Sequence, residues 1–420
     1  MSPKPPATTP QPDGKPALTP KLRFPEFRDA GGWEEETLSG VATVVMGSSP
    51  KSECYNQSQT GLPLLQGNAD IKNRLSAPRI FTSEITKECT IGDILLSVRA
   101  PVGSVAKSIH HACIGRGIAA VRANQPNSQE FVYQWLLSYE PRWGDISQGG
   151  TFDAVNSDDL KGVAFALPTP PEQQKIAECL SSVDELMAAQ VRKLDALKTH
   201  KKGLMQQLFP RAGETQPRLR FPEFQAAGEW VVTTIGQLGD VVTGSTPSTA
   251  RPEYYGGDRM FVSPADISDG RFIDKTKTTL TALGFEETRP IKANSILFVC
   301  IGSTIGKIAQ NRHECATNQQ INSVVPNSNN DHGFVYYALS GMADEIANLA
   351  GRQAVPIVNK SLFSSVGLLV PKPAEQQRIA DCLTSLDDLI AAQAQKLDGL
   401  KTHKQGLMQQ LFPSPEEVEA

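Results

Sequence analysis

The sequence predicts an α/β protein, with two α/β domains separated by two long helices that form an antiparallel coiled coil with pseudo-two-fold symmetry. Three observations support this prediction: a segment that occurs twice, variable chain between the copies, and a heptad pattern through each copy. The segment LKTHKKGLMQQLFP at residues 197–210 returns at 400–413 with one difference, Lys202 against Gln405. A repeat this close indicates that one structural unit is used twice.

Short landmarks extend the repeat to the rest of the chain. RFPEF at residues 23–27 returns at 220–224, and a tryptophan soon follows each copy. Residues 34–166 and 231–369 resemble each other more faintly, although GSSP in the first matches GSTP in the second. We expect two diverged copies of one fold between fixed ends.

These landmarks set the expected boundaries along the chain. We expect a disordered N-terminal tail at residues 1–20 and a first domain at 21–170, followed by a first long helix at 171–210. A second domain at 211–370, a second long helix at 371–413 and an acidic tail at 414–420 would complete the chain.

Each domain has the signals of a mixed α/β fold. The β-rich runs at residues 93–98 and 295–300, bounded by glycine and proline, predict strands. Residues 131–139 and 334–342 have helical apolar spacing. We expect a curved, partly antiparallel sheet in each domain.

Composition sets the broad class of the protein. A chain of 420 residues with 39% hydrophobic residues can bury two cores. No apolar run has the length of a membrane span, and the first residues lack a signal-peptide pattern, so we expect a cytoplasmic protein. The seven cysteines form no CxxC pair, which is typical of reduced, mostly buried thiols.

The long helices begin at repeated motifs, PEQQKIA at residues 171–177 and AEQQRIA at 374–380. Each continues for roughly 37 residues without proline, on the order of 55 Å. Leucine and other apolar residues follow a heptad pattern. The predicted seam comprises Ile176, Leu180, Val183, Met187, Gln190, Leu194, Leu197, Lys201, Leu204 and Leu208 in the first helix, and Ile379, Leu383, Leu386, Ile390, Gln393, Leu397, Leu400, Lys404, Leu407 and Leu411 in the second.

Polar seam residues and the charge pattern predict the helix orientation. Gln190 and Lys201 interrupt the first seam where Gln393 and Lys404 interrupt the second, which either fixes the register or marks where the seam opens to solvent. Both helices carry acidic residues early and basic residues late. Antiparallel packing places opposite charges side by side, although each exposed pair contributes only ~0.2–1 kcal/mol.

No catalytic signature occurs in the sequence. Residues 302–307, GSTIGK, approach a phosphate-binding loop, but one residue is missing between the glycines and Ile308 stands where Ser or Thr should be. A glycine turn between two strands is the better interpretation. The chain has neither paired metal-ligand spacing nor a methyltransferase motif, so we expect that it is not an enzyme by itself.

The motifs together resemble those of a known family. Variable region and long helix alternate twice, RFPEF precedes a tryptophan, EQQ opens each helix, and LKTHK followed by GLMQQLF closes it. This arrangement closely resembles the specificity subunit of type I restriction-modification enzymes, over nearly the whole chain apart from the tails.

The resemblance implies a DNA-binding role within a complex. Each variable region would be a target recognition domain that reads one half of a bipartite, asymmetric double-stranded DNA site. The helices would act as spacers and as docking sites for two methyltransferase subunits, and endonuclease-translocase subunits would complete the complex. The chain would hold no cofactor, whereas S-adenosylmethionine, ATP and Mg²⁺ would be bound by the partners.

Candidate DNA contacts are polar or basic residues in expected loops, because such side chains hydrogen-bond to base edges. In the first domain they are Gln66, Asn68, Arg74, Arg99 and Arg116, with Gly150 and Thr151 in the glycine-bearing loop 149–152. In the second domain they are Arg251, Tyr254, Lys307, Gln319 and Arg352, the last in the loop 351–355. Each has the alternative interpretation of an ordinary solvated residue.

Net charge leaves two other functions open. The chain has a formal net charge of -4, whereas DNA-binding proteins usually present a basic surface. A stand-alone repressor of a bipartite site should bind DNA tightly without partners, which the acidity argues against. A protein–protein adaptor is compatible with the charge.

Overall fold

The computed structural model describes residues 18–143, 154–268, 270–351 and 355–413. Residues 1–17 of the predicted N-terminal tail (1–20) and the whole predicted tail at 414–420 lie outside these ranges. At the start of the described chain, the Trp33 backbone N–H donates to the Leu18 carbonyl at 2.7 Å. The chain forms two compact units, Met1–Gln190 with Lys396–Ala420, and Val191–Gln395. Each unit therefore holds one domain, the first half of one long helix and the second half of the other.

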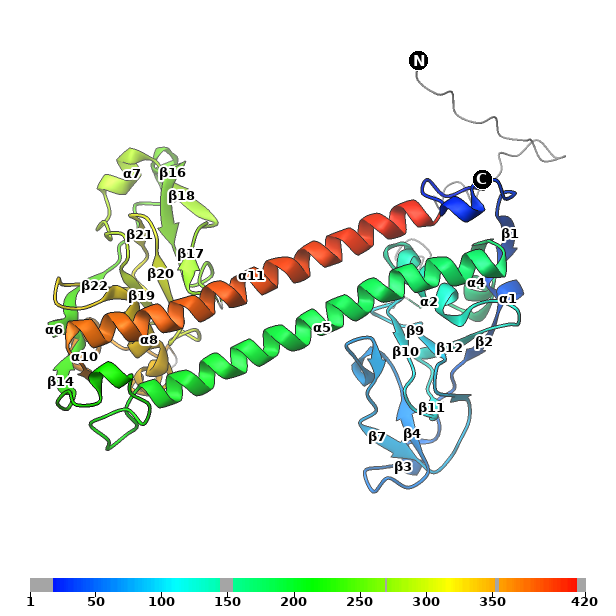
Figure 1. Cartoon of the computed structure of the whole chain (residues 1–420), viewed down its shortest axis with the longest axis horizontal. Coiled ribbons are helices and arrows are strands. Elements are labelled where there is room, and N and C mark those ends of the chain that lie inside the picture. The colour runs from blue at the N-terminus through cyan, green and yellow to red at the C-terminus, as the bar shows by residue number, and fades with distance from the viewer. Residues whose placement is uncertain (1–17, 144–153, 269, 352–354, 414–420) are drawn as a thin grey trace, which may run out of the picture. The chain divides into compact units, whose positions relative to one another are not determined.

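The first domain contains two main sheets and a short strand pair (Figure 1). One sheet has the order β2 (Ala42–Met46), β12 (Ile118–Ala123), β9 (Ile94–Ser97), β10 (Val105–Lys107), β6 (Leu75–Ser76), β5 (Ile71–Lys72). The other has the order β3 (Tyr55–Asn56), β7 (Ile80–Thr82), β4 (Leu62–Leu65), β11 (Ala112–Ile114), β8 (Glu88–Cys89). Strands β1 (Glu34–Thr37) and β13 (Ala164–Leu167) pair separately, and the helices are α1 (Leu38–Val41), α2 (Gln129–Tyr139) and α4 (Ser157–Lys161).

The second domain repeats this arrangement. Its larger sheet has the order β15 (Gly239–Thr243), β22 (Ile321–Pro326), β19 (Ile296–Val299), β20 (Ile308–Asn311), β17 (Phe272–Ile273). Its smaller sheet has the order β18 (Thr278–Leu280), β16 (Tyr255–Val262), β21 (Ala316–Thr317), and β14 (Val231–Thr234) pairs with β23 (Gly367–Val370). The helices are α6 (Ile235–Leu238), α7 (Ala282–Glu286), α8 (His332–Gly341), α9 (Ala343–Asn348) and α10 (Lys360–Ser365).

The predicted elements are confirmed where the sequence signals were strongest. The runs 93–98 and 295–300 contain β9 and β19. The helical segment 131–139 lies in α2, and 334–342 matches α8 except for its last residue, Met342. Both domains mix parallel pairs, such as β4 with β11, and antiparallel pairs, such as β9 with β12. The GSTIGK segment forms the turn between β19 and β20, with positive φ at Gly302 and Gly306, as predicted.

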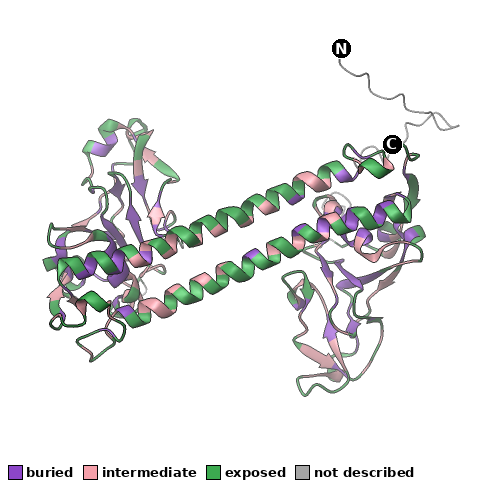
Figure 2. Cartoon of the chain, in the orientation of Figure 1, coloured by how far each residue is buried: buried purple, intermediate pink, exposed green. Residues whose placement is uncertain are grey.

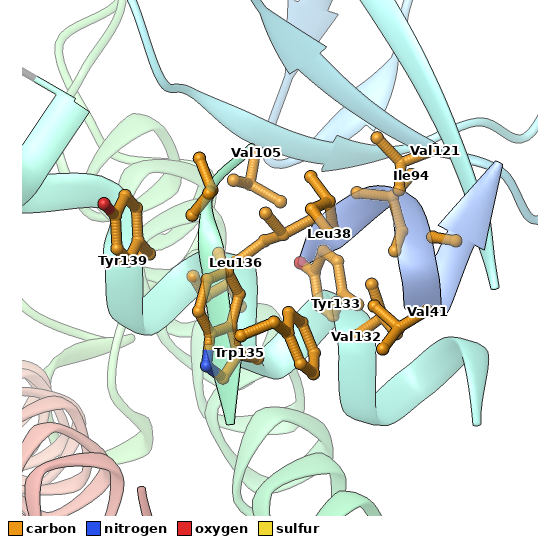
Figure 3. Close-up of a cluster of buried hydrophobic side chains, with 14 of the residues drawn as sticks. Leu38, Val41, Ile94, Val105, Val121, Val132, Tyr133, Trp135, Leu136 and Tyr139 are labelled. Carbon is orange, nitrogen blue, oxygen red and sulfur yellow. The ribbon is translucent and has the colours of Figure 1, made fainter. Parts of the chain in front are cut away.

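The largest buried cluster of each domain lies between its larger sheet and a helix, and a smaller cluster joins strands of its two sheets. In the first domain, Val132 and Leu136 of α2 pack with Leu38 of α1 and with Ile94 and Val121 of the sheet (Figure 3). All these side chains are almost fully buried, and the sheet interiors are buried in both domains (Figure 2). Burial of apolar area supplies the main driving force for folding.

The two long helices, α5 (Pro170–Leu208) and α11 (Pro373–Leu411), each span 39 residues. A proline opens each helix, where its missing N–H costs no hydrogen bond, and another proline follows the end of each. Every residue of the predicted seam is buried or half-buried, whereas Leu186 and Leu389 outside the seam are exposed.

The helix segments run in opposite directions within each unit. In the first unit Lys404 of α11 donates to Asp184 of α5 at 2.7 and 2.8 Å, while Leu411 joins the core cluster that contains Leu180. In the second unit Lys201 of α5 donates to Asp387 of α11 at 2.5 Å. The two lysines that interrupt the predicted seam therefore meet a carboxylate partner.

Candidate nucleic-acid interface

Each domain has a constant side, where repeated motif residues fasten it to the long helices. In the first unit, the Arg23 guanidinium donates to both oxygens of the buried Glu172 carboxylate at 2.8 and 2.7 Å. Trp33 Nε1 also donates to this carboxylate, at 3.2 Å. RFPEF, the tryptophan and the EQQ motif are thus parts of one buried contact.

The second unit repeats this contact atom for atom. Arg220 donates to Glu375 at 2.8 and 2.7 Å, and Trp230 Nε1 donates to it at 3.4 Å. The hydrogen bonds and the negative charge of Glu375 raise the pKa of Arg220. Charge-assisted bidentate pairs of this kind are strong and directional.

A second repeated contact joins three parts of each unit: a helix of the domain, the first half of one long helix and the second half of the other long helix. Gln134 of α2 donates to Asp184 at 2.8 Å, and Tyr337 of α8 donates to Asp387 at 2.6 Å. These are the same aspartates that bind Lys404 and Lys201. Burial, followed by the neighbouring Asp387, raises the pKa of Tyr337, so its hydroxyl remains a hydrogen-bond donor at neutral pH.

The first rim, which we define as residues 47–50, 66–68, 98–99 and 115–117, lies where strands β2, β4, β9 and β11 end and β12 begins. Backbone hydrogen bonds hold these loops together: Ser48 donates to Ile114 at 2.9 Å and Val98 donates to Gly117 at 2.9 Å. The loops approach closely because of glycine. A Cβ on Gly117 would lie 2.2 Å from the Gln66 carbonyl oxygen.

Arg116 is presented from the centre of the first rim. Its backbone N–H and its Nε both donate to Ser49 Oγ, at 3.2 and 3.3 Å, and the residue is exposed. Among the described residues, its terminal guanidinium nitrogens meet no acceptor and no carboxylate. They therefore remain available to a ligand.

The second rim, which we define as residues 244–247, 263–265, 300–301 and 317–320, has the same backbone connections. Ser245 donates to Thr317 at 2.9 Å and Cys300 donates to Gln320 at 2.7 Å, as Ser48 and Val98 do in the first rim. Thr246 Oγ1 donates to Oε1 of Gln319 at 2.7 Å. Gln319 is exposed and occupies the position that Arg116 has in the first domain.

The predicted contacts of the first domain do not all reach its rim. Gln66, Asn68, Arg99 and Arg116 come from the rim loops, and Gln66 Nε2 donates to the Tyr55 hydroxyl at 2.8 Å. Arg74 lies elsewhere, because its guanidinium donates to both Glu140 oxygens at 2.6 and 2.8 Å and to the Val105 carbonyl at 3.0 Å. Hydrogen bonds to Glu140 raise the pKa of Arg74.

Of the described predicted contacts in the second domain, Gln319 belongs to the second rim, whereas Arg251, Tyr254 and Lys307 lie outside its residues. Arg251 and Tyr254 follow the GSTP loop, where Arg251 ion-pairs with Glu253 at 3.7 Å and stacks over the Tyr254 ring at 5.7 Å. Lys307 Nζ donates to the Ile267 carbonyl at 3.1 Å.

Three predicted contacts, Gly150, Thr151 and Arg352, lie outside the described residues. The described residues that follow them reach the rims, since Ala154 bridges to Arg99 and Ile357 bridges to Ile301. The hydroxyls of Ser49 and Thr246, which hydrogen-bond to Arg116 and Gln319, were not among the predicted contacts. The recurrence of GSSP and GSTP at matching places was the available signal.

No group of three or more His, Cys, Asp or Glu side chains among the described residues could bind a metal ion. Burial raises the pKa of the Cys300 and Cys315 thiols to about 12, so both are poor nucleophiles. Among the described helices, none combines the length and apolar composition of a transmembrane span.

The sequence matches a known family model twice. The model of the type I restriction modification DNA specificity domain matches residues 30–199 and again residues 227–402. A Methanocaldococcus jannaschii protein that carries the name of the type I restriction enzyme MjaX specificity subunit is 35% identical over 167 residues, which cover 40% of this chain and 39% of that protein. The HindI specificity subunit of Haemophilus influenzae is 32% identical over 147 residues, covering 34% of this chain and 32% of the relative. These alignments span well under two thirds of either relative.

The fold is similar to that of a solved structure along nearly the whole chain. The S subunit of a type I restriction-modification system from M. genitalium superposes with a TM-score of 0.62 at 18% identity. The superposition covers 94% of this chain and 100% of that subunit. The likeness extends to both domains and both long helices.

Proposed function

The chain belongs to the type I restriction-modification DNA specificity family, and we propose that it selects the DNA sequence on which a type I complex acts. One observation carries the proposal: two domains present different polar side chains from equivalent rims, while their helix-facing contacts are the same. Two domains with different rim side chains and the same contacts to the helices are suited to a DNA site whose two halves differ in sequence. A repressor or an adaptor remains a weaker alternative, because neither accounts for the family match.

Each domain would act as a target recognition domain that binds one half-site through its rim. Arg99 and Arg116 in the first domain supply positive charge that no described carboxylate neutralises. In the second domain, Lys307 and Arg289 hydrogen-bond to backbone carbonyls and form no described ion pair. Such cations can bind phosphates while amide and guanidinium groups contact base edges.

The long helices would form an antiparallel coiled coil with pseudo-two-fold symmetry that fixes the gap between half-sites. The partly buried contacts of Asp184 with Lys404 and of Asp387 with Lys201 support a fixed register. In this proposal the first recognition domain comprises residues 21–170 and the second comprises residues 211–370, and the spacer helices comprise residues 171–210 and 371–413. The asymmetry of the site would come from the different side chains on the two rims.

Partner subunits would dock on the exposed residues of the repeated helix segment. Lys198, Thr199 and His200 are exposed in α5, as are their identical counterparts in α11. Two identical surfaces suit two copies of a methyltransferase subunit. The chain itself would be non-catalytic and cytoplasmic, and S-adenosylmethionine, ATP and Mg²⁺ would be bound by the methyltransferase and endonuclease-translocase partners.

Co-expression with the cognate methyltransferase subunit tests the proposal. We expect the two proteins to co-purify and the host genome to acquire N6-methyladenine within one bipartite consensus. Methylation without a bipartite consensus, or failure to co-purify, would refute the proposal. A repressor would instead bind its site tightly in the absence of any partner.

A further inference from the structure

We propose that Arg116 and Gln319 are the equivalent specificity-determining residues of the two domains, with Arg116 contacting a guanine and Gln319 contacting an adenine. This inference rests on the proposed function and goes beyond it by naming one position per domain and the base class that each would select. It depends on the equivalence of the two positions, on their exposure and on the chemistry of the two side chains.

The backbone establishes the equivalence. Arg116 lies two residues before Ile118, whose carbonyl accepts from Gly47 at 2.9 Å. Gln319 lies two residues before Ile321, whose carbonyl accepts from Gly244 at 3.1 Å. Both positions therefore sit on the same turn into the same strand, β12 in one domain and β22 in the other.

A hydroxyl positions each side chain. Ser49 Oγ accepts from Nε of Arg116, and Thr246 Oγ1 donates to Oε1 of Gln319. The two hydroxyls occupy the same place in GSSP and GSTP. Orienting a long side chain before binding lowers the entropy lost when it contacts a base.

The free atoms of each side chain match one base. With Nε held by Ser49, the two terminal nitrogens of Arg116 can donate to the O6 and N7 acceptors of guanine. Gln319 keeps Nε2 as a donor for adenine N7, and its Oε1 retains a second lone pair for the adenine N6 amino group. An identical scaffold thus carries side chains with different base preference.

The other candidates are less suited to this role. Arg74, Arg251 and Gln66 already bind Glu140, Glu253 and Tyr55, respectively. Arg99 is free of described ion pairs, but its counterpart in the second domain is Ile301, as shown by the matching bridges to Ala154 and Ile357. A position used by both domains for base contact should carry a polar side chain in both.

The test uses the full chain in complex with the methyltransferase subunit and maps methylated sites genome-wide. R116Q should change one base of one half-site from guanine towards adenine, and Q319R should make the reverse change in the other half-site. The preference at that position should shift by ~10- to 100-fold, as expected when a bidentate base contact is replaced. R116A should leave this position degenerate.

Matched controls carry the same substitutions outside the rims. Arg218 is exposed and pairs with Glu214 in the segment between α5 and the second domain, and Gln225 is exposed near RFPEF. R218Q and Q225R should preserve the complete consensus, and co-purification with the methyltransferase checks that every variant folds.

The outcomes separate this inference from the proposed function. If the unaltered complex methylates a bipartite site and R116Q and Q319R retain both half-sites with unchanged preference, the residue assignment is overturned and the proposed function stands. If the unaltered complex methylates no bipartite site, both are overturned. A base change in the half-site of the other domain would also overturn the assignment.

Discussion

The two sides of each domain differ in how closely they repeat. On the helix-facing side, Arg23 with Glu172 and Arg220 with Glu375 have the same donors, acceptors and distances of 2.8 and 2.7 Å. On the rims, the backbone connections repeat but Arg116 is replaced by Gln319. The constant motifs are therefore constrained by the contacts that hold the fold together, whereas residue types differ on the exposed rims, where each proposed half-site would bind.

Removing the Arg220–Glu375 contact on the constant side should have the largest effect on stability. E375A would leave the buried Arg220 guanidinium and the Trp230 indole N–H without their acceptor, so we expect a loss of about 3–5 kcal/mol in the free energy of unfolding. Chemical denaturation measures it. The double variant R220M/E375L should recover part of the loss, because it removes both charges. A loss below ~1 kcal/mol for E375A would contradict the importance of this contact.

Loss of the contact of Asp387 with Lys201 should have the second-largest effect on stability. D387N removes the negative charge beside Lys201. It also replaces one of the two oxygens that accept from Lys201 and from the Tyr337 hydroxyl with an amide NH2 that cannot accept, which should cost about 1.5–3 kcal/mol. The neighbouring D388N, on an exposed aspartate, should change stability by less than ~0.5 kcal/mol. Equal losses in the two variants, compared by thermal unfolding, would show that the contact has no special role.

The two rims should differ in how much stability they lose when the residue before β12 or β22 is changed to alanine. G117A places a Cβ against the Gln66 carbonyl, so we expect destabilisation of about 1–3 kcal/mol and weaker methylation. The second rim has Gln320 at the equivalent place, and Q320A should be milder because a Cβ is already accommodated there. Denaturation of both variants makes the comparison; a harmless G117A would mean that close loop approach is not required.

The smallest effect is expected from removal of the Ser49 hydroxyl, which hydrogen-bonds to Arg116. S49A removes the acceptor of Arg116 but leaves its base-contacting nitrogens, so the consensus should persist with preference at one position reduced by less than ~10-fold. Sequencing of methylated sites at limiting enzyme measures this preference. Loss of preference in the other half-site would show that the two rims are not independent.

The regular parts of the fold were predictable because their signals are local. The heptad pattern and prolines located both long helices to within a few residues, and Lys201 and Lys404 were identified as polar positions that either fix the register or mark where the seam opens to solvent. Their partners could not be identified, because Lys404 lies 220 residues from Asp184. The same limit concealed the contact of Arg23 with Glu172, 149 residues apart.

Residue type alone was a weaker guide to the rims. Arg74 was selected because arginine contacts DNA well, yet Glu140, 66 residues later, holds its guanidinium. Arg116 was selected for the same reason and does lie on the first rim. What distinguishes them is an acidic partner brought close by tertiary folding, together with the flanking glycines that present Arg116. The smaller sheet was not anticipated, because its strands are short and lack clear alternation.

The most direct test of the central claim is to replace residues 231–369 with a copy of residues 34–166 and to map methylation with the same methyltransferase. If the variable stretches carry the specificity and the constant side only holds them, both half-sites should become the first domain's half-site, as an inverted repeat. A site that keeps its original asymmetric sequence, or one in which both halves are new, would contradict the account.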